Sequence, residues 1–265
     1  MNILNFRRKK VYYHMAKLPN APLQEVIFEV KWDLDVKEET NQTYDKGFDI
    51  AAGKFSGIVQ DQFPVVRRKL PEEIPNNFLN YQTVYQYKSG VQTWPILQLG
   101  PGIFTVNDTD KNYDWDKTYF PLIKRGINWL EKAYTKNLNF RFASLKYIDT
   151  IKVNDYGFKG DWKSFISQQL NVSFQNQFDI SGKLTNAQLN QAFALEDESN
   201  LQVSVSSGKT NKLNEPLLIW QIGIQKQKMF QKTDLFEWLE HSHDIASDLF
   251  KKIVKQDLYD SFTQT

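Results

Sequence analysis

The order of predicted elements occurs twice along this chain of 265 residues, and this restricts the folds that it can adopt. In the first half, apolar and polar side chains alternate over residues 24–32, as in a strand with one buried face. Apolar residues at three- and four-residue steps predict helices over 45–62 and 118–136. Turn residues between these helices separate three predicted strands, at 81–88, 94–99 and 103–107.

The second half has a matching order. Residues 140–153 predict a long strand, with Asp149 in an otherwise apolar row, and residues 162–170 predict a short helix. Further strands are predicted near 172–181, 192–196, 201–206 and 217–226. A long helix closes the chain, from an N-cap at Asp234 to about Tyr259.

These patterns predict an α+β fold made of a duplicated β-α-β-β-β-α unit, with an antiparallel sheet and helices packed on one face. The repeats would cover residues 18–139 and 140–265, although no residue-level repeat is visible. Residues 1–17 are basic and lack a clear period, so a flexible, solvated arm is favoured over a tail that contacts phosphate or membrane. Met15 opens a stretch that resembles a natural beginning, which makes it an alternative to Met1 as the start of translation.

Composition excludes several kinds of chemistry. Cysteine is absent, which removes disulfides, thiolate nucleophiles and Cys-based zinc or iron–sulfur sites. With only His14, His241 and His243, a centre built from several histidines is also disfavoured. The common hydrolase and dinucleotide-binding motifs, Gly-x-Ser-x-Gly and Gly-x-Gly-x-x-Gly, do not occur. We therefore expect no cofactor and favour a protein that is not an enzyme.

The charge distribution bears on the partner. The formal net charge is +2, but five positive charges precede residue 20, and the remainder carries 28 Lys and Arg against 31 Asp and Glu. Nucleic-acid-binding domains are usually strongly basic, so the body of the chain argues against such a partner. No run approaches the roughly 18 apolar residues of a membrane helix, and residues 1–20 lack the apolar stretch of a secretion signal. We expect a cytoplasmic protein without a membrane role.

Clustered carboxylates make the stretch from Leu99 to Trp115 the first place to look for chemistry. Asp108, Asp110, Asp114 and Asp116 offer oxygen ligands for a hard cation, with metal-dependent hydrolysis as one use. An EF-hand loop starting at Asp108 would need Gly and Glu where Tyr113 and Tyr119 stand, so that specific motif fails. The favoured interpretation is that these residues solvate a loop and stabilise the N-terminus of the next helix.

The same stretch contains two glycines and two other candidate residues. Gly100 and Gly102 could present backbone N–H groups to an anion, but no P-loop motif follows, and a tight hairpin is favoured. Asn107 is predicted to cap or turn the chain. We expect Trp115 to anchor the helix that follows it.

Two further polar residues fall in apolar rows. His243 belongs to the predicted buried stripe of the last helix, whereas His241 lies on its polar side, so the two cannot share a ligand. A buried, hydrogen-bonded His243 is favoured over a catalytic one. A buried Asp149 needs partners or a shifted pKa, and a structural polar network is favoured over a ligand contact.

A resemblance to a known family rests on several stretches along the chain. They are Leu18-Pro-Asn-Ala-Pro-Leu-Gln-Glu-Val-Ile-Phe-Glu-Val30, Leu99-Gly-x-x-x-Phe104-x-x-Asn107 with Tyr113-x-Trp115, Lys146-Tyr-Ile-Asp-x-Ile151, and Trp238 followed by His243 and Phe250. Together they resemble a sporadically distributed, uncharacterised family of bacterial and archaeal proteins of about this length. Its patchy occurrence implies genes that move between genomes, as defence and toxin–antitoxin genes do. The chain differs from the family at Asp149, where the family more often has Asn.

Two functions are compatible with these observations. We predict a non-catalytic binding or regulatory protein with a protein partner, as a partner subunit or antitoxin-like component of a mobile defence-type module. A small-molecule ligand is compatible with the same fold, and the binding groove should be lined by aromatic side chains. The alternative is a metal-dependent hydrolase or nuclease that uses the Asp108–Asp116 cluster. The candidate binding residues are Gly100, Gly102, Asn107, Trp115, Asp149 and His243.

Overall fold

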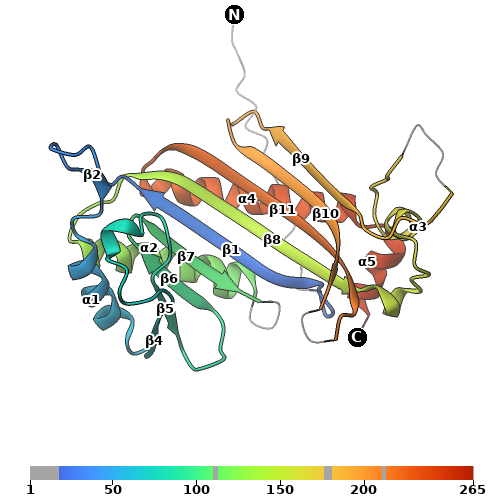
Figure 1. Ribbon diagram of the computed structural model, residues 1–265, viewed down its shortest axis with the longest axis horizontal. Helices are drawn as coiled ribbons and strands as arrows, with labels where there is room; N and C mark the ends of the chain where they lie inside the picture. Colours follow the sequence, from blue (N-terminus) through green and yellow to red (C-terminus); the bar gives the residue numbers. More distant parts are fainter. Residues whose placement is uncertain (1–17, 110–112, 176–180, 211–212, 265) are drawn as a thin grey trace, which may run out of the picture.

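One antiparallel sheet of nine strands forms the centre of the protein (Figure 1). The structure, a computed structural model, describes residues 18–109, 113–175, 181–210 and 213–264. The strand order across the sheet is β4-β5-β6-β7-β1-β8-β11-β10-β9. The strands are β1 (Leu23–Trp32), β4 (Val65–Arg68), β5 (Tyr85–Lys88), β6 (Ile96–Gly100), β7 (Ile103–Asp108), β8 (Phe140–Lys152), β9 (Gln188–Ala194), β10 (Asn200–Lys209) and β11 (Pro216–Phe230). A separate ribbon pairs β2 (Asp35–Val36) with β3 (Thr43–Tyr44).

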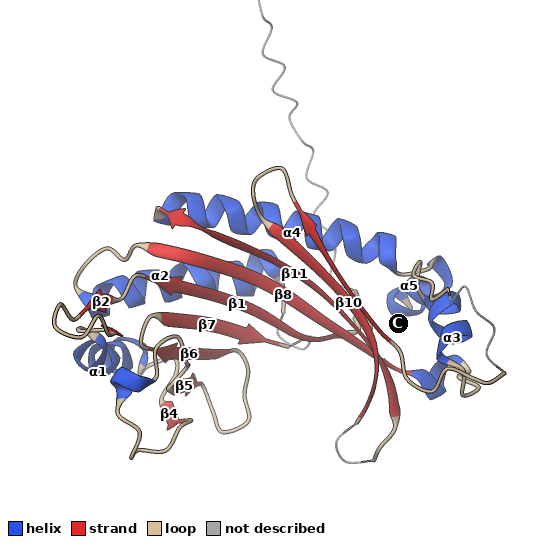
Figure 2. Ribbon diagram, turned by 45° about the horizontal axis from the view of Figure 1, so that its top comes forward, coloured by secondary structure: helices blue, strands red, loops and turns tan. Residues whose placement is uncertain are grey.

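The longest helices cover one face of this sheet and leave the other face open. The helices are α1 (Phe48–Val59), α2 (Phe120–Tyr134), α3 (Trp162–Gln169), α4 (Lys232–Ile253) and α5 (Gln256–Thr263). Helices α2 and α4 lie behind the sheet, α1 packs beside α2 at one end, and α3 and α5 lie together at the other end (Figure 2). The predicted α+β class with a large antiparallel sheet is confirmed. Across the described part of the chain, every helix is too short or too polar to cross a bilayer.

Alternation along the central strands separates the two faces. In β1, Val26, Phe28 and Val30 are fully buried beneath the helices, and Ile27 and Glu29 between them lie on the open face. Each strand of the central pair begins one half of the described chain. Outward from β1 the order is β7, β6, β5, β4, and outward from β8 it is β11, β10, β9. Helix α2 follows β7 in sequence, and α4 follows β11.

The last predicted helix is wrong in two respects. Its N-cap is Gln231, and Asp234 lies one turn inside, where its charge favours the helix N-terminus. The helix stops at Ile253 because Val254 is extended and forms a β-bridge with Leu170, which joins the end of α3 to the end of α4. Helix α5 then begins separately.

Other predicted boundaries also need correction. The helix predicted over 45–62 spans Phe48–Val59. The three- and four-residue steps of its sequence predict a buried stripe of Phe48, Ala51, Phe55, Ile58 and Gln62, but Ile58 is exposed and Val59 is buried instead. The strand near 172–181 does not form over 172–175, and residues 176–180 lie outside the described residues. Strand β4 was not predicted, because Pro64 and two arginines resemble a loop but are also tolerated on a sheet edge. The predicted arm, residues 1–17, lies outside the described residues.

Candidate functional site

The predicted binding residues lie in three separate places. Gly100 and Gly102 flank the turn between β6 and β7, which confirms the predicted hairpin. The turn packs against neighbouring backbone: a Cβ on Gly100 would lie 1.8 Å from the carbonyl oxygen of Gln82. Gly102 has a φ of +74° and donates its N–H to Asp45 Oδ2 at 3.0 Å. Close packing and turn geometry therefore account for both glycines.

Trp115 and His243 meet on the helix-covered side of the sheet. The His243 ring stacks on Trp115 with a centroid distance of 4.1 Å, and Phe120 also stacks with the indole, at a centroid distance of 5.0 Å. His243 Nδ1 is 2.8 Å from the Tyr147 hydroxyl, which lies 3.1 Å from the hydroxyl of Tyr113. The predicted hydrogen bonding of His243 is confirmed, although its side chain is half-buried. Trp115 is buried in a π-helical turn, Trp115–Tyr119, that leads directly into α2.

Asp149 lies on the same side of β8, two residues beyond Tyr147. Its side chain is buried, and burial raises the pKa of the carboxyl to about 8. Within the described residues, no group forms a hydrogen bond with this carboxyl. Trp220 faces Asp149 across β8 and β11, and its buried indole N–H also has no partner in the described part of the chain. Burial therefore favours the neutral form of the carboxyl.

Two described carboxylates of the acidic cluster, Asp108 and Asp114, accept hydrogen bonds from the local backbone, and Asp116 lies exposed in the π-helical turn Trp115–Tyr119. Asp108 is buried at the end of β7 and accepts a hydrogen bond from the N–H of Thr109 at 2.8 Å. Asp114 caps the π-helical turn by accepting from the N–H of Lys117, and the two side chains also form an ion pair. Asp110 lies outside the described residues. Among the residues that the structure describes, no three acidic or histidine side chains are arranged to hold a metal ion.

Asn107 belongs to a chain of polar side chains on the open face of the first half. The predicted role as a cap or turn is wrong, because Asn107 lies within β7 and is paired with residues of β1 and β6. Lys69 Nζ donates to Gln98 Oε1 at 2.8 Å, Gln98 Nε2 donates to Asn107 Oδ1 at 3.0 Å, and Asn107 Nδ2 donates to Glu25 Oε1 at 2.7 Å. The amides connect a cation to a carboxylate with all donors in one direction, so these bonds strengthen one another.

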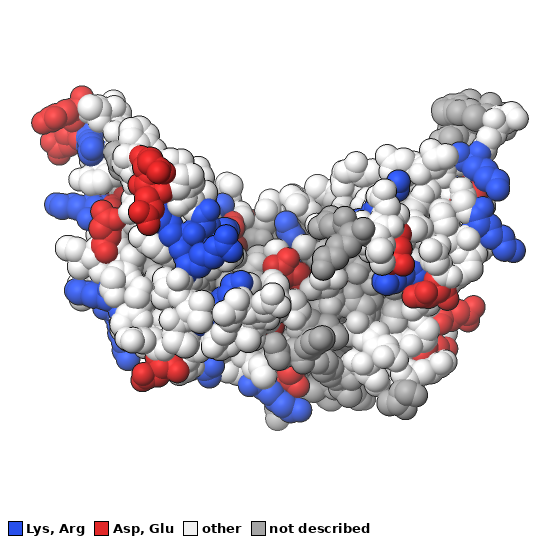
Figure 3. Space-filling model, turned by 60° about the horizontal axis from the view of Figure 1, so that its bottom comes forward, with Lys and Arg blue, Asp and Glu red and all other residues white. Residues whose placement is uncertain are grey.

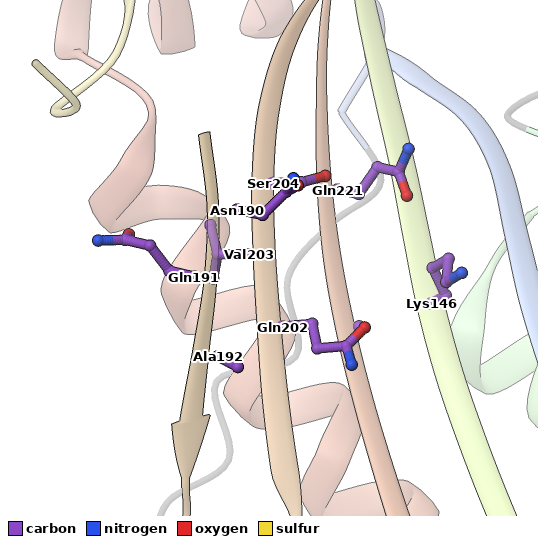
Figure 4. Close-up of a pocket in the computed structure, with 9 residues that line it drawn as sticks. Lys146, Asn190, Gln191, Ala192, Gln202, Val203, Ser204 and Gln221 are labelled. Atoms are coloured by element: carbon purple, nitrogen blue, oxygen red, sulfur yellow. The ribbon is translucent and has the colours of Figure 1, made fainter. Parts of the chain in front are cut away.

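The open face of the second half differs from that of the first, because the polar side chains described at its centre do not hydrogen-bond to one another. A depression of about 370 Å³ lies over β8, β11, β10 and β9. It is lined by Lys146, Asn190, Gln191, Ala192, Gln202, Val203, Ser204, Gln221 and Gly223. Figure 4 shows Lys146, Gln202 and Gln221 around the backbone of β11, whereas Gln191 points away past the outer edge of β9.

Gly223 forms the floor of this depression. It pairs with Lys146 on β8 and with Gln202 on β10, so the missing side chain leaves a space between them. Among the described residues, the side chains of Lys146, Gln202 and Gln221 have no ion-pair or hydrogen-bond partner. Figure 3 shows the molecule hollowed between two raised ends, with a dense group of Lys and Arg on the left-hand wall of the hollow. The side chains over β11 are therefore available to a ligand.

The amino-acid pattern contained a signal for this depression. Gln221, Gly223, Gln225 and Gln227 recur at every second position of β11, and Gln202 and Ser204 do so on β10. A row of neutral amides on one face of a strand is distinct from an ordinary charged, solvated face. The lining of this depression is not aromatic: it consists of amides, a serine, a lysine, small residues and a valine.

Comparisons with known proteins add no assignment to this geometry. No protein-family model matches the chain, and no curated protein matches it.

Proposed function

We propose that this chain is a non-catalytic binding protein that holds a polypeptide partner on the open face of its second half. The observation that carries the proposal is the depression over Gly223, with amide side chains that are free of partners within the described residues. In the cell, the protein would act as a partner subunit or antitoxin-like component of a mobile defence-type module in the cytoplasm.

The chemistry of the lining favours a polypeptide over a nucleic acid. Asn and Gln side chains both donate and accept hydrogen bonds, as peptide groups do. Phosphate recognition instead needs several cations, and among the described residues Lys146 is the single charged one that lines the depression. A floor without a side chain also lets a backbone approach closely.

We also propose that the two halves, residues 18–139 and 140–265, arose by duplication of one unit. The matching strand orders on either side of the β1–β8 pair support this, as do the helices that follow β7 and β11. The halves would then have diverged on the open face. In the first half Gln98 and Asn107 bind each other, whereas in the second half the amides are left for a partner.

Filling the depression tests the proposed function. The chain is co-expressed with the product of each neighbouring gene, and the product that co-purifies is titrated against purified variants. We expect Gly223→Ile to weaken this complex by roughly tenfold or more, because the new side chain occupies the floor. Fold stability should not fall, because a β-branched residue suits a strand interior better than glycine by about 0.5–1 kcal/mol.

Two controls separate blocked binding from a damaged fold. Gly223→Ala adds only a Cβ, which would lie 3.8 Å from the Lys146 side chain, and should leave most of the affinity. Thr150→Ile places the same large side chain on the open face of β8, outside the depression, and should bind as the wild type does. Failure of every neighbouring product to bind, or unchanged binding by Gly223→Ile, would contradict the proposal.

A further inference from the structure

The two edge strands of the sheet, β4 and β9, differ in how well they are protected against pairing with a strand of another molecule. Strand β4 is four residues long, follows Pro64 and carries Arg67 and Arg68, which are features that discourage pairing with another strand. Strand β9 is seven residues long, has the sequence QLNQAFA, and contains neither a charge nor a proline. It pairs with β10 on one side, and within the described residues its other side has no strand neighbour. Its backbone is therefore an open template for a further strand.

Strand β9 is complementary to a second copy of itself. We propose that β9 pairs antiparallel with β9 of another molecule, with a twofold axis at Gln191. In this register Leu189 faces Phe193 of the other copy, and the symmetry produces this apolar pair twice. Asn190 faces Ala192, and Gln191 faces its own copy, where amide side chains can bond to each other.

The pairing covers an apolar side chain that the single chain leaves in water. Phe193 is 45% exposed, although it lies on the helix-covered side of the sheet next to the buried Leu201. Leu189 lies on the same side, opposite the buried Val205. Contact between Phe193 of one copy and Leu189 of the other would remove both side chains from solvent. Burial of this apolar surface favours the dimer over the monomer.

Charge also favours this arrangement. A twofold axis brings residues near it against their own copies, so a charged residue there would face a like charge. The seven residues of β9 are uncharged. The acidic turn after the strand, Glu196 to Glu198, would lie opposite Asn186 and the residues before it, so the two acidic turns stay at opposite ends of the pair.

The dimer would join the open faces of two molecules into one continuous surface. Asn190 and Ala192 line the depression and lie on the open side of β9. The two depressions would therefore adjoin each other across the axis. Self-pairing does not rest on the proposed partner, and it can be tested on the purified chain alone.

A charge introduced at the axis provides the test. In sedimentation velocity over a wide range of concentration, we expect the wild type to be a dimer. Gln191→Lys and Gln191→Glu should each raise the dissociation constant by roughly tenfold or more, because like charges meet at the axis. An equal mixture of the two variants should recover a dimer. A matched control, Val66→Lys on the opposite edge, should behave as the wild type does, because Val66 is exposed on β4.

A cross-link provides a second, independent measurement. The chain has no cysteine, so Gln191→Cys introduces a unique thiol. Under mild oxidation it should form a covalent dimer, whereas Val66→Cys should not, because only facing strands bring two Cβ atoms within disulfide range. A wild type that is monomeric at all concentrations, or a dimer unaffected by Gln191→Lys, would overturn the proposal.

Discussion

Replacing Gly100 with alanine is expected to leave little folded protein. The new Cβ would lie 1.8 Å from the carbonyl oxygen of Gln82 and 2.8 Å from its carbonyl carbon. These are backbone atoms, and hydrogen bonds from Val84 to Leu99 and from Tyr81 to Pro101 hold the two segments together. Neither side can move away without breaking the sheet, so we expect a loss of more than about 3 kcal/mol in the free energy of unfolding. Urea unfolding and the soluble yield measure this loss.

A matched glycine-to-alanine substitution elsewhere should raise the free energy of unfolding instead of lowering it. A Cβ on Gly53, within α1, meets nothing within 4 Å. Gly53→Ala should therefore stabilise the protein by about 0.5–1 kcal/mol, since alanine favours a helix over glycine. If Gly100→Ala proved as stable as the wild type, the close approach of Gln82 to β6 would be wrong.

Local patterns were sufficient for much of the fold. Alternation placed β1 and β8 correctly, because one face of each packs against helices. For the helix predicted over 118–136, the three- and four-residue steps predict a buried stripe of Phe120, Ile123, Ile127, Leu130 and Tyr134, and all five are buried in α2. Such elements are predictable because a single periodic face decides their burial.

Features that depend on distant residues were not predictable in the same way. The two glycines around Pro101 indicated a turn, but nothing nearby in sequence pointed to the Gln82 carbonyl that excludes a side chain at Gly100. Asn107 resembled a turn residue because its partners, Gln98 and Glu25, come from other strands. The same limit applies to the candidate site, where amides of similar pattern are occupied in one half and free in the other.

Removing the charge of Asp149 should stabilise the protein at high pH. Burial raises the pKa of this carboxyl from 3.8 in the unfolded chain to about 8 in the folded protein. The folded state therefore binds more protons than the unfolded state between these values, and its stability falls as the pH rises from about 4 to 8. An asparagine side chain at this position would remain neutral throughout. We expect Asp149→Asn to match the wild type near pH 4 and to exceed it by a few kcal/mol at pH 8.

Denaturant unfolding of the wild type and of Asp149→Asn between about pH 4 and 8 isolates the contribution of Asp149 to the free energy of unfolding. The other titrating groups are the same in both proteins, so their contributions cancel when the two free energies are subtracted. Asp161 offers a control of opposite sign: its side chain caps α3, and hydrogen bonds, chiefly from Ser164, lower its pKa. Asp161→Asn should therefore be less stable than the wild type at neutral pH and approach its stability in acid, below the pKa of the carboxyl.

A pH-independent difference in stability between Asp149→Asn and the wild type would mean that Asp149 stays charged in the folded protein. The carboxyl would then need a hydrogen-bond donor close by. Trp220 occupies the facing position on β11, and its buried indole N–H has no partner among the described residues.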